Sequence, residues 1–356
     1  MSRRISFRYE LLRGGAYCAL LKAVSRTPRI RANSADRLKM LLTGQFAPWA
    51  RDVDGRPVEI DWLSDEIRPV MIIDGNEYPL GVFVPVRPEE SRSGPVTTVS
   101  LSAYDRTQKV ADMNSASLLY WPAGTPYLDA VEQLLSASGI NTVFKTPSAA
   151  TFAEAREDWE LGTPFLDAAN KLLSEINYNP LWFNQDGAAV LEPASVPEAS
   201  AIEHVLDTND KDTRVIGGSF TRTRDLFNAP NVFVVVCQNP EKGAPMTATA
   251  TNENPQSPLS VPRRGRQIVS VTRVDNIPDQ AALDAYAARL CAQSMITGET
   301  IKVETGLLPG WGVADVVALN YEGETSICIS RSWDMELKAG GRMVHTLEKV
   351  VYNLDD

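Results

Sequence analysis

Apolar and polar residues alternate along the first 115 residues in the pattern of strands that bury one face. Residues 5–11 carry an apolar side chain at every second position, and Gly14-Gly15 then supplies a turn. Residues 98–103 alternate in the same way, and Asp74-Gly75 is the signal of a tight turn between two apolar runs. The pattern predicts a β-rich first unit over residues 1–115.

A repeated segment marks residues 116–197 as a different kind of unit. Gly-Thr-Pro-Tyr-Leu-Asp-Ala at 124–130 returns at 162–168 with one aromatic exchange, so that Thr125 and Thr163 are 38 positions apart. Each copy has threonine at a helix N-cap position, proline at the first helical position and aspartate in the first turn. Apolar residues follow at helical spacing, and Asn-Gln-Asp-Gly at 184–187 is a hairpin signal. We expect two related helices on a short sheet.

Strand patterns return from residue 198. Residues 232–236 are all apolar, which predicts a strand buried on both faces. Five prolines among many Asn, Thr and Ser residues predict a long exposed loop over 239–262, and a helix is expected over 278–294. Further strands are expected at 301–307, at 313–321 and on both sides of residues 338–341.

The predicted fold class is therefore β-rich α+β, with a small α/β unit inserted between two β-rich units. The first β unit covers 1–115, the insert 116–197 and the second β unit 198–356, which itself contains a loop–helix insertion at about 239–296. A chain of 356 residues is too long for one ordinary core and agrees with several domains.

Composition narrows the class of protein. Hydrophobic residues make up 44% and charged residues 22%, the balance of a soluble globular chain. No run reaches the ~18 apolar residues of a membrane span, and no apolar segment follows the basic start, so we expect no membrane insertion and no signal peptide. We therefore expect the chain to be made and folded in the cytoplasm.

Four scattered cysteines and two histidines give no expectation of a disulfide, a metal site or another cofactor. The cysteines are Cys18, Cys237, Cys291 and Cys328.

The net charge of −10 hides an asymmetry. Residues 1–50 carry ten Lys and Arg against two acids, which leaves −18 on the remainder. The basic residues stand between apolar ones, as on a strand with one solvated face. Two alternatives to a solvated face are contact with an acidic protein neighbour and contact with nucleic acid. Arg263, Arg264 and Arg266 form a second basic cluster. These arginines are either solvated or make forked contacts to carboxylates of a neighbouring subunit. The second alternative makes the three arginines the candidate subunit contact.

Catalytic motifs are absent from the sequence. It contains no dinucleotide, phosphate-loop, zinc-protease or serine-hydrolase signature. His204 and His345 lie in strand-like segments, which favours structural roles. The acids of residues 154–160 qualify for a test as a glycosidase pair, but their spacing suits a solvated face equally well. Cys237 has no histidine in sequence reach to activate its thiol. We expect no catalytic residues and no enzymatic activity.

Six phrases spread over residues 55–350 add a signal that lies in their order along the chain. They are Asp-Trp-Leu-Ser-Asp-Glu-Ile-Arg-Pro at 61–69, Tyr-Pro-Leu-Gly-Val-Phe at 78–83, Tyr-Asp-Arg-Thr-Gln at 104–108, Ile-Asn-Tyr-Asn-Pro-Leu-Trp at 176–182, Asn-Ala-Pro-Asn-Val-Phe-Val at 228–234 and Asp-Gln-Ala-Ala-Leu-Asp-Ala-Tyr-Ala at 279–287. In this order they resemble the tail-tip or baseplate hub proteins of siphophages and related prophages. The basic N-terminus resembles them less.

The resemblance implies two β-barrel domains related to the tail-tube fold, so that a homotrimer presents six barrels and adapts the sixfold tube to threefold tip components. It implies contact with a distal tail protein ring or the tail tube, the tape measure protein, and tip fibre or lysin proteins. DNA would pass only in transit through a channel with an acidic lining. The implied location is the virion tail tip or baseplate, assembled in the host cytoplasm. Many relatives continue into a C-terminal peptidase, lysin or fibre module, and we expect that activity to be absent here or supplied by another polypeptide.

Two other functions stay open at this point. A cell-wall hydrolase of the tail tip would release dye from labelled cell walls. A receptor-binding adhesin would carry an aromatic groove of the kind that binds carbohydrates, and would bind host cells by itself.

Overall fold

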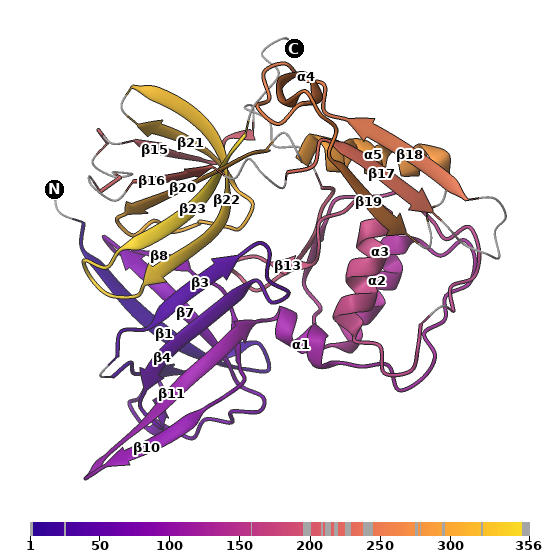
Figure 1. Ribbon diagram of the computed structural model, residues 1–356. Coiled ribbons are helices and arrows are strands. Elements are labelled where there is room, and N and C mark those ends of the chain that lie inside the picture. The colour runs from indigo at the N-terminus through magenta and orange to yellow at the C-terminus, as the bar shows by residue number, and fades with distance from the viewer. Residues whose placement is uncertain are drawn as a thin grey trace.

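The computed structural model describes residues 3–24, 26–157, 159–194, 201–207, 209–210, 215–216, 220–224, 229–237, 245–274, 277, 279–293, 296–321 and 323–350. Two β-rich units lie on one side of the molecule, and two smaller α/β layers lie on the other (Figure 1). The fold class is β-rich α+β, as the sequence predicts.

The first β unit contains the strands that the alternating pattern predicts. β1 pairs in antiparallel fashion with β2 and β7, and β4 pairs with β11. Asp74 and Gly75 connect β7 to β8 with φ angles of 50° and 91°, so the predicted tight turn is confirmed. The strands are β1 (Ile5–Arg13), β2 (Ala16–Leu21), β3 (Arg29–Asn33), β4 (Met40–Phe46), β5 (Ala50–Arg51), β6 (Pro57–Val58), β7 (Glu66–Ile73), β8 (Asn76–Pro79), β9 (Phe83–Pro85), β10 (Glu89–Ser93) and β11 (Val96–Asp105).

The insert has its own core, formed by the apolar faces of two helices against a short sheet. The predicted related helices are confirmed, and the turn at 184–187 joins two antiparallel strands as expected. Its elements are α2 (Tyr127–Ala137), β12 (Val143–Lys145), α3 (Phe165–Glu175), β13 (Trp182–Phe183) and β14 (Ala189–Leu191). The short helix α1 (Thr107–Asp112), at the end of the first unit, packs its Val110 into the same core.

The predicted threonine caps of these helices are wrong. The N-cap residues are Pro126 and Pro164, and neither helix has a side-chain cap. The hydroxyls of Thr125 and Thr163 instead donate backwards, to the carbonyls three residues before them, at 2.8 and 2.7 Å. The repeated motif therefore closes a turn before each helix rather than capping its first amides.

The second β unit returns to long antiparallel pairs. β22 pairs with β21 on one side and β23 on the other, and β20 closes against β23. Its strands are β15 (His204–Asp207), β16 (Thr221–Arg224), β20 (Ile296–Thr305), β21 (Val316–Tyr321), β22 (Glu324–Glu336) and β23 (Met343–Val350).

The two β units share a sheet. β3 of the first unit pairs with the end of β22 of the second, from Asn33 opposite Ser332 to Arg29 opposite Glu336. The same buried cluster of apolar side chains runs through both units. Tyr9 supports this β3–β22 junction from inside, because its hydroxyl donates to the carbonyl of Leu337 at 3.3 Å. The two units are thus one continuous body, which the sequence pattern did not reveal.

A second small layer, called here the outer layer, lies beside the insert in Figure 1. Its sheet has β17 (Val232–Cys237) between β18 (Met246–Thr251) and β19 (Val269–Val274), and α5 (Gln280–Gln293) covers one face. The strand and the helix predicted here are confirmed, but the strand is not buried on both faces as predicted, because Val234 and Val236 are only half-buried on the face that α5 does not cover. The predicted long exposed loop is wrong for residues 246–262, which form β18, a buried polar turn and the start of the short helix α4 (Val261–Arg264). Residues 238–244 lie outside the described part.

Candidate assembly surface and central cleft

The arginine segment is held firmly on the outer layer. The buried amide of Asn231 donates to the carbonyls of Leu259 and Arg266, both at 3.0 Å, and its oxygen accepts from the amide of Ile268 at 2.7 Å. One side chain therefore ties both ends of α4 to the start of β17. The Arg264 guanidinium donates to the carbonyl of Ala229 at 2.6 Å, so this arginine is half-buried and partly structural.

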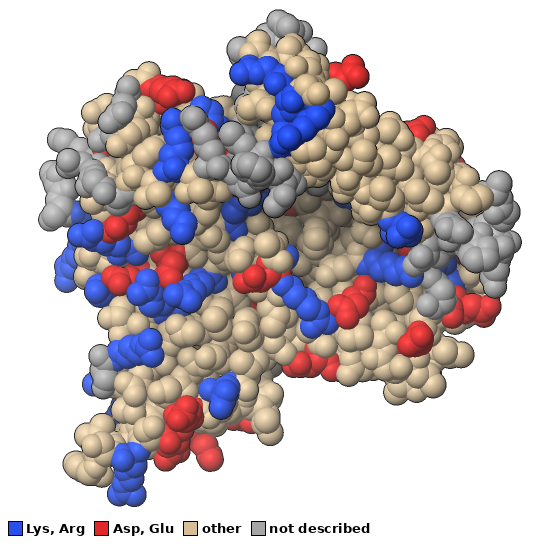
Figure 2. Space-filling view, in the orientation of Figure 1, with Lys and Arg blue, Asp and Glu red and all other residues tan. Residues whose placement is uncertain are grey.

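Arg263 and Arg266 are exposed at the same place. Figure 2 shows basic side chains gathered over α4. Val269 and Val271 follow on β19 and are 53% and 55% exposed. The two valines lie on the face of the sheet that α5 does not cover, three and five residues after Arg266, and Arg263, Arg266, Val269 and Val271 are together called here the arginine surface. Exposed apolar side chains rimmed by charge are typical of protein contact sites.

Both histidines of the chain contact Trp311, which the sequence did not indicate. The ring of His204 stacks on Trp311 at 4.2 Å, and its Nε2 lies 2.9 Å from Asp315 Oδ2. His345 lies at 4.3 Å on another side of Trp311, fully buried, with Nε2 2.9 Å from the Thr305 hydroxyl. Burial lowers the pKa of His345 to about 3. An imidazole this hard to protonate is a core residue and a poor general base.

The acids of residues 154–160, considered above as a glycosidase pair, lie at the surface as far as the structure describes them. Glu154, Glu157 and Glu160 are exposed, and Asp158 lies outside the described residues. The buried charged residue of this stretch is Arg156, which no sequence pattern indicated. It turns inward to form a buried ion pair with Glu175 at 2.6 Å, with the rings of Phe152 and Trp159 at its sides.

The described part of the chain contains no group of three or more His, Cys, Asp or Glu side chains placed to hold a metal ion. Among the helices in that part, none is long and apolar enough to cross a membrane.

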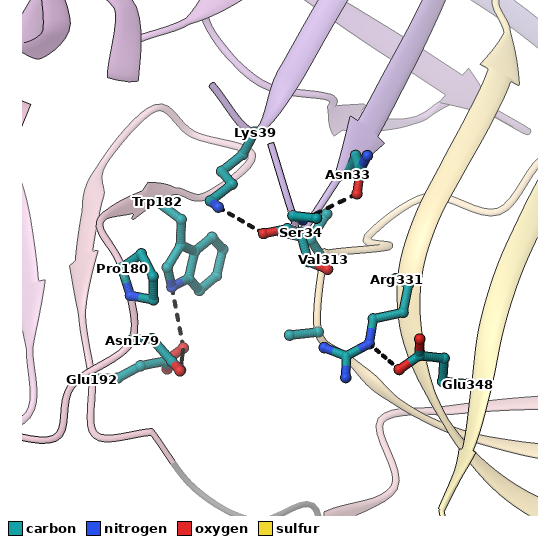
Figure 3. A pocket seen from close by; sticks show the side chains of 12 residues that line it. Asn33, Ser34, Lys39, Asn179, Pro180, Trp182, Glu192, Val313, Arg331 and Glu348 are labelled. Carbon is teal, nitrogen blue, oxygen red and sulfur yellow. Dashed lines mark hydrogen bonds and ion pairs between the residues drawn. The ribbon is translucent and has the colours of Figure 1, made fainter. Parts of the chain in front are cut away.

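A cleft of about 440 Å³ opens where the first β unit, the insert and the second β unit meet. Figure 3 shows its two side walls. Trp182 and Pro180 of the insert form one wall together with Asn179 and Glu192. The opposite wall carries Arg331 on β22 and Glu348 on β23, and the loop between β3 and β4 closes the end between them. The remaining lining residues are Asn33, Ser34, Ala35, Lys39, Val313 and Ala314.

No family model matches the chain, and no curated protein matches it. Solved structures do. The tail protein of Neisseria meningitidis superposes with a TM-score of 0.65 at 16% identity over 96% of each chain. The 43 kDa tail protein of prophage MuSo2 from Shewanella oneidensis gives 0.63 at 15% identity, over 96% of this chain and 98% of that one. Prophage tail protein gp18 from Listeria monocytogenes gives 0.58 at 12% identity, over 98% and 95%. The chain has the fold of these tail proteins over nearly its whole length.

Proposed function

We propose that the chain is a structural hub of a phage or phage-like tail tip, a homotrimer that adapts the sixfold tail tube to threefold tip components. The observation that carries this proposal is the pairing of the two β units through β3 and β22, within a fold shared with prophage tail proteins. Two β units per chain supply six units in a ring of three copies. The domain division at 1–115, 116–197 and 198–356 belongs to the same proposal.

Rigidity is what a hub under axial load requires, and the β3–β22 junction supports it. Its backbone ladder is reinforced on the surface by Arg29 and Arg31, which both bind Asp334, at 2.8 and 2.7 Å. Each exposed ion pair contributes little alone, about 0–1 kcal/mol. Together with the common core, the ladder joins the two units in one continuous packed body, which supports the proposed role under axial load.

The arginine surface is the proposed contact with the next subunit or tail protein. Arg263 and Arg266 provide forked donors for carboxylates, and Val269 and Val271 provide apolar area beside them. Arg264 belongs to the same cluster, although its bond to Ala229 occupies part of its donor capacity. The −18 carried by residues 51–356 makes an acidic counter-surface on a second copy available.

The proposal includes the partners and the location of such a hub. It would meet the distal tail ring or tail tube above, the tape measure protein on the axis, and fibre or lysin proteins below, with DNA passing only in transit. The chain would act without catalysing a reaction, in a virion tail tip assembled in the host cytoplasm. Neither a cell-wall hydrolase nor any other enzyme is favoured by a specific observation.

Immunogold labelling of intact particles tests the proposed place directly. Antibodies against the purified chain should label the distal end of the tail, at one position per particle. Label along the tube, on the head or on no particle contradicts a tail-tip hub.

A further inference from the structure

The walls of the central cleft are each built from contacts within one unit. Glu192 Oε1 accepts from the Trp182 indole at 3.1 Å and from the Asn179 amide at 3.3 Å, all within the insert. Arg331 Nε donates to Glu348 Oε2 at 2.7 Å within the second β unit. Among the described residues, no hydrogen bond joins the 179–192 wall to the Arg331–Glu348 wall across the cleft. The two walls are therefore fixed independently and face each other across open space.

Hydrogen-bonding groups remain available on both walls. Within the described residues, Glu192 Oε2 and Glu348 Oε1 accept no hydrogen bond, and the two terminal nitrogens of Arg331 donate none. Figure 3 shows the Arg331 guanidinium directed into the cleft, opposite Trp182. The Trp182 ring is half-buried, and its bond to Glu192 fixes its orientation. The cleft thus offers an aromatic face, two acceptors and a fork of donors in fixed positions.

The charge of the cleft limits the kind of ligand. Lys39 and Arg331 balance Glu192 and Glu348. The Lys39 ammonium donates to the carbonyls of Ser34 and Asp36, both at 2.7 Å, and burial lowers its pKa. The Arg331 charge is already paired with Glu348. Among the described residues that line the cleft, the two positive and two negative charges cancel, so an anionic chain such as nucleic acid is disfavoured even though the Arg331 terminal nitrogens can still donate hydrogen bonds.

We propose that this cleft binds a neutral saccharide. A sugar ring presents a flat C–H face that packs on an indole, and hydroxyls that both donate to carboxylates and accept from a guanidinium. The cleft volume of about 440 Å³ lies in the usual range of ligand pockets, about 300–1,000 Å³, and junctions between domains are where such pockets occur. This binding activity is separate from the hub function and depends on no oligomeric state.

Ligand-observed NMR on the purified full-length protein tests the proposal, with β-1,4-linked N-acetylglucosamine tetramer and maltotetraose as probes. At least one probe should bind with a Kd of about 1 mM or tighter, with saturation transfer strongest at ring protons on one face. Trp182→Ala and Glu192→Gln should each weaken binding about tenfold or more. Trp49→Ala is the matched control, because Trp49 is 48% exposed and does not line the cleft.

Arg331→Gln serves if Trp182→Ala does not fold, because it leaves the aromatic wall intact and removes the fork of donors. It too should weaken the binding of the sugar. Three results overturn the proposal: no binding of either probe at about 10 mM, binding by the Trp182→Ala and Arg331→Gln variants as tight as that of the wild-type protein, or binding of a proline-rich peptide in place of both sugars. None of these results bears on where the chain lies in the particle.

Discussion

His345 offers a quantitative test of the core of the second β unit. It is fully buried between β20 and β22, against Trp311 and the Thr305 hydroxyl. Burial depresses its pKa from 6.5 to about 3, so protons bind the unfolded chain more tightly than the folded one. The stability that this site contributes is complete above pH 6.5 and is lost as the pH falls from 6.5 towards 3.

The magnitude follows from the two pKa values. Each pH unit below 6.5 costs about 1.4 kcal/mol, so lowering the pH from 7.5 to 5.0 removes about 2 kcal/mol through His345. Asp105 acts in the opposite direction. Burial raises its pKa to about 6, and the protonated form that it favours in the fold adds about 1.4 kcal/mol over the same interval. The comparison must therefore be made against a variant in which Asp105 is unchanged.

His345→Gln is that variant, because glutamine keeps a partner for the Thr305 hydroxyl and does not titrate. Urea unfolding at fixed protein concentration, at pH 7.5 and 5.0, should show the wild-type protein losing about 2 kcal/mol more than the variant. Side-chain NMR gives a direct check, since the chain has only two histidines and the variant assigns both. The His345 signal should stay in its neutral form down to about pH 4. Titration of His345 near pH 6.5, or equal pH slopes for the two proteins, refutes the reasoning.

Three further outcomes are expected. Arg156→Met should destabilise the insert by about 3–5 kcal/mol in thermal unfolding, because it strands the buried Glu175 carboxylate, and adding Glu175→Met should recover most of the loss; a double variant as unstable as the single one contradicts this. Thr163→Ala should cost less than about 1 kcal/mol by the same measurement, because the Thr163 hydroxyl caps no helix. A larger loss would indicate that this hydroxyl does cap α3. Arg263→Glu combined with Arg266→Glu should lower the yield of assembled particles without changing the melting temperature of the chain. The matched double reversal Arg56→Glu with Arg87→Glu should assemble normally. Equal particle yields from both double variants would mean that Arg263 and Arg266 are solvated and make no subunit contact.

Local patterns predicted most individual elements because their causes are local. The alternation of residues 5–11 and the Asp74-Gly75 turn depend on neighbours a few positions away, and the structure confirms them. The helices of the repeat follow from apolar spacing, but the predicted threonine caps do not form, because the Thr125 hydroxyl is turned back to donate to the Pro122 carbonyl and accepts from no helix amide. Residues 246–251 carry a regular Thr–Ala alternation that indicates a strand, and the prolines around them concealed it.

The junctions between units lay beyond sequence patterns. Asn33 pairs with Ser332 at a separation of almost the whole chain, and nothing in either strand marks its partner. In the sequence, Arg156 is one charge in an acidic stretch. Its inward direction depends on Glu175, 19 residues away, and on the packed rings of Phe152 and Trp159, which the local pattern does not show. The cleft is assembled from three distant segments, so neither Trp182 nor Arg331 stands out in the sequence.

The symmetry of the hub in the intact particle tests the central claim most directly. Electron cryomicroscopy of the tail tip, reconstructed without imposed symmetry, should show three copies of this chain around the axis, with their two β units alternating in a ring of six. The mass of the isolated ring should be three times the 39.1 kDa of one chain. Six copies around the axis, each with only one β unit facing the tube, would contradict the account.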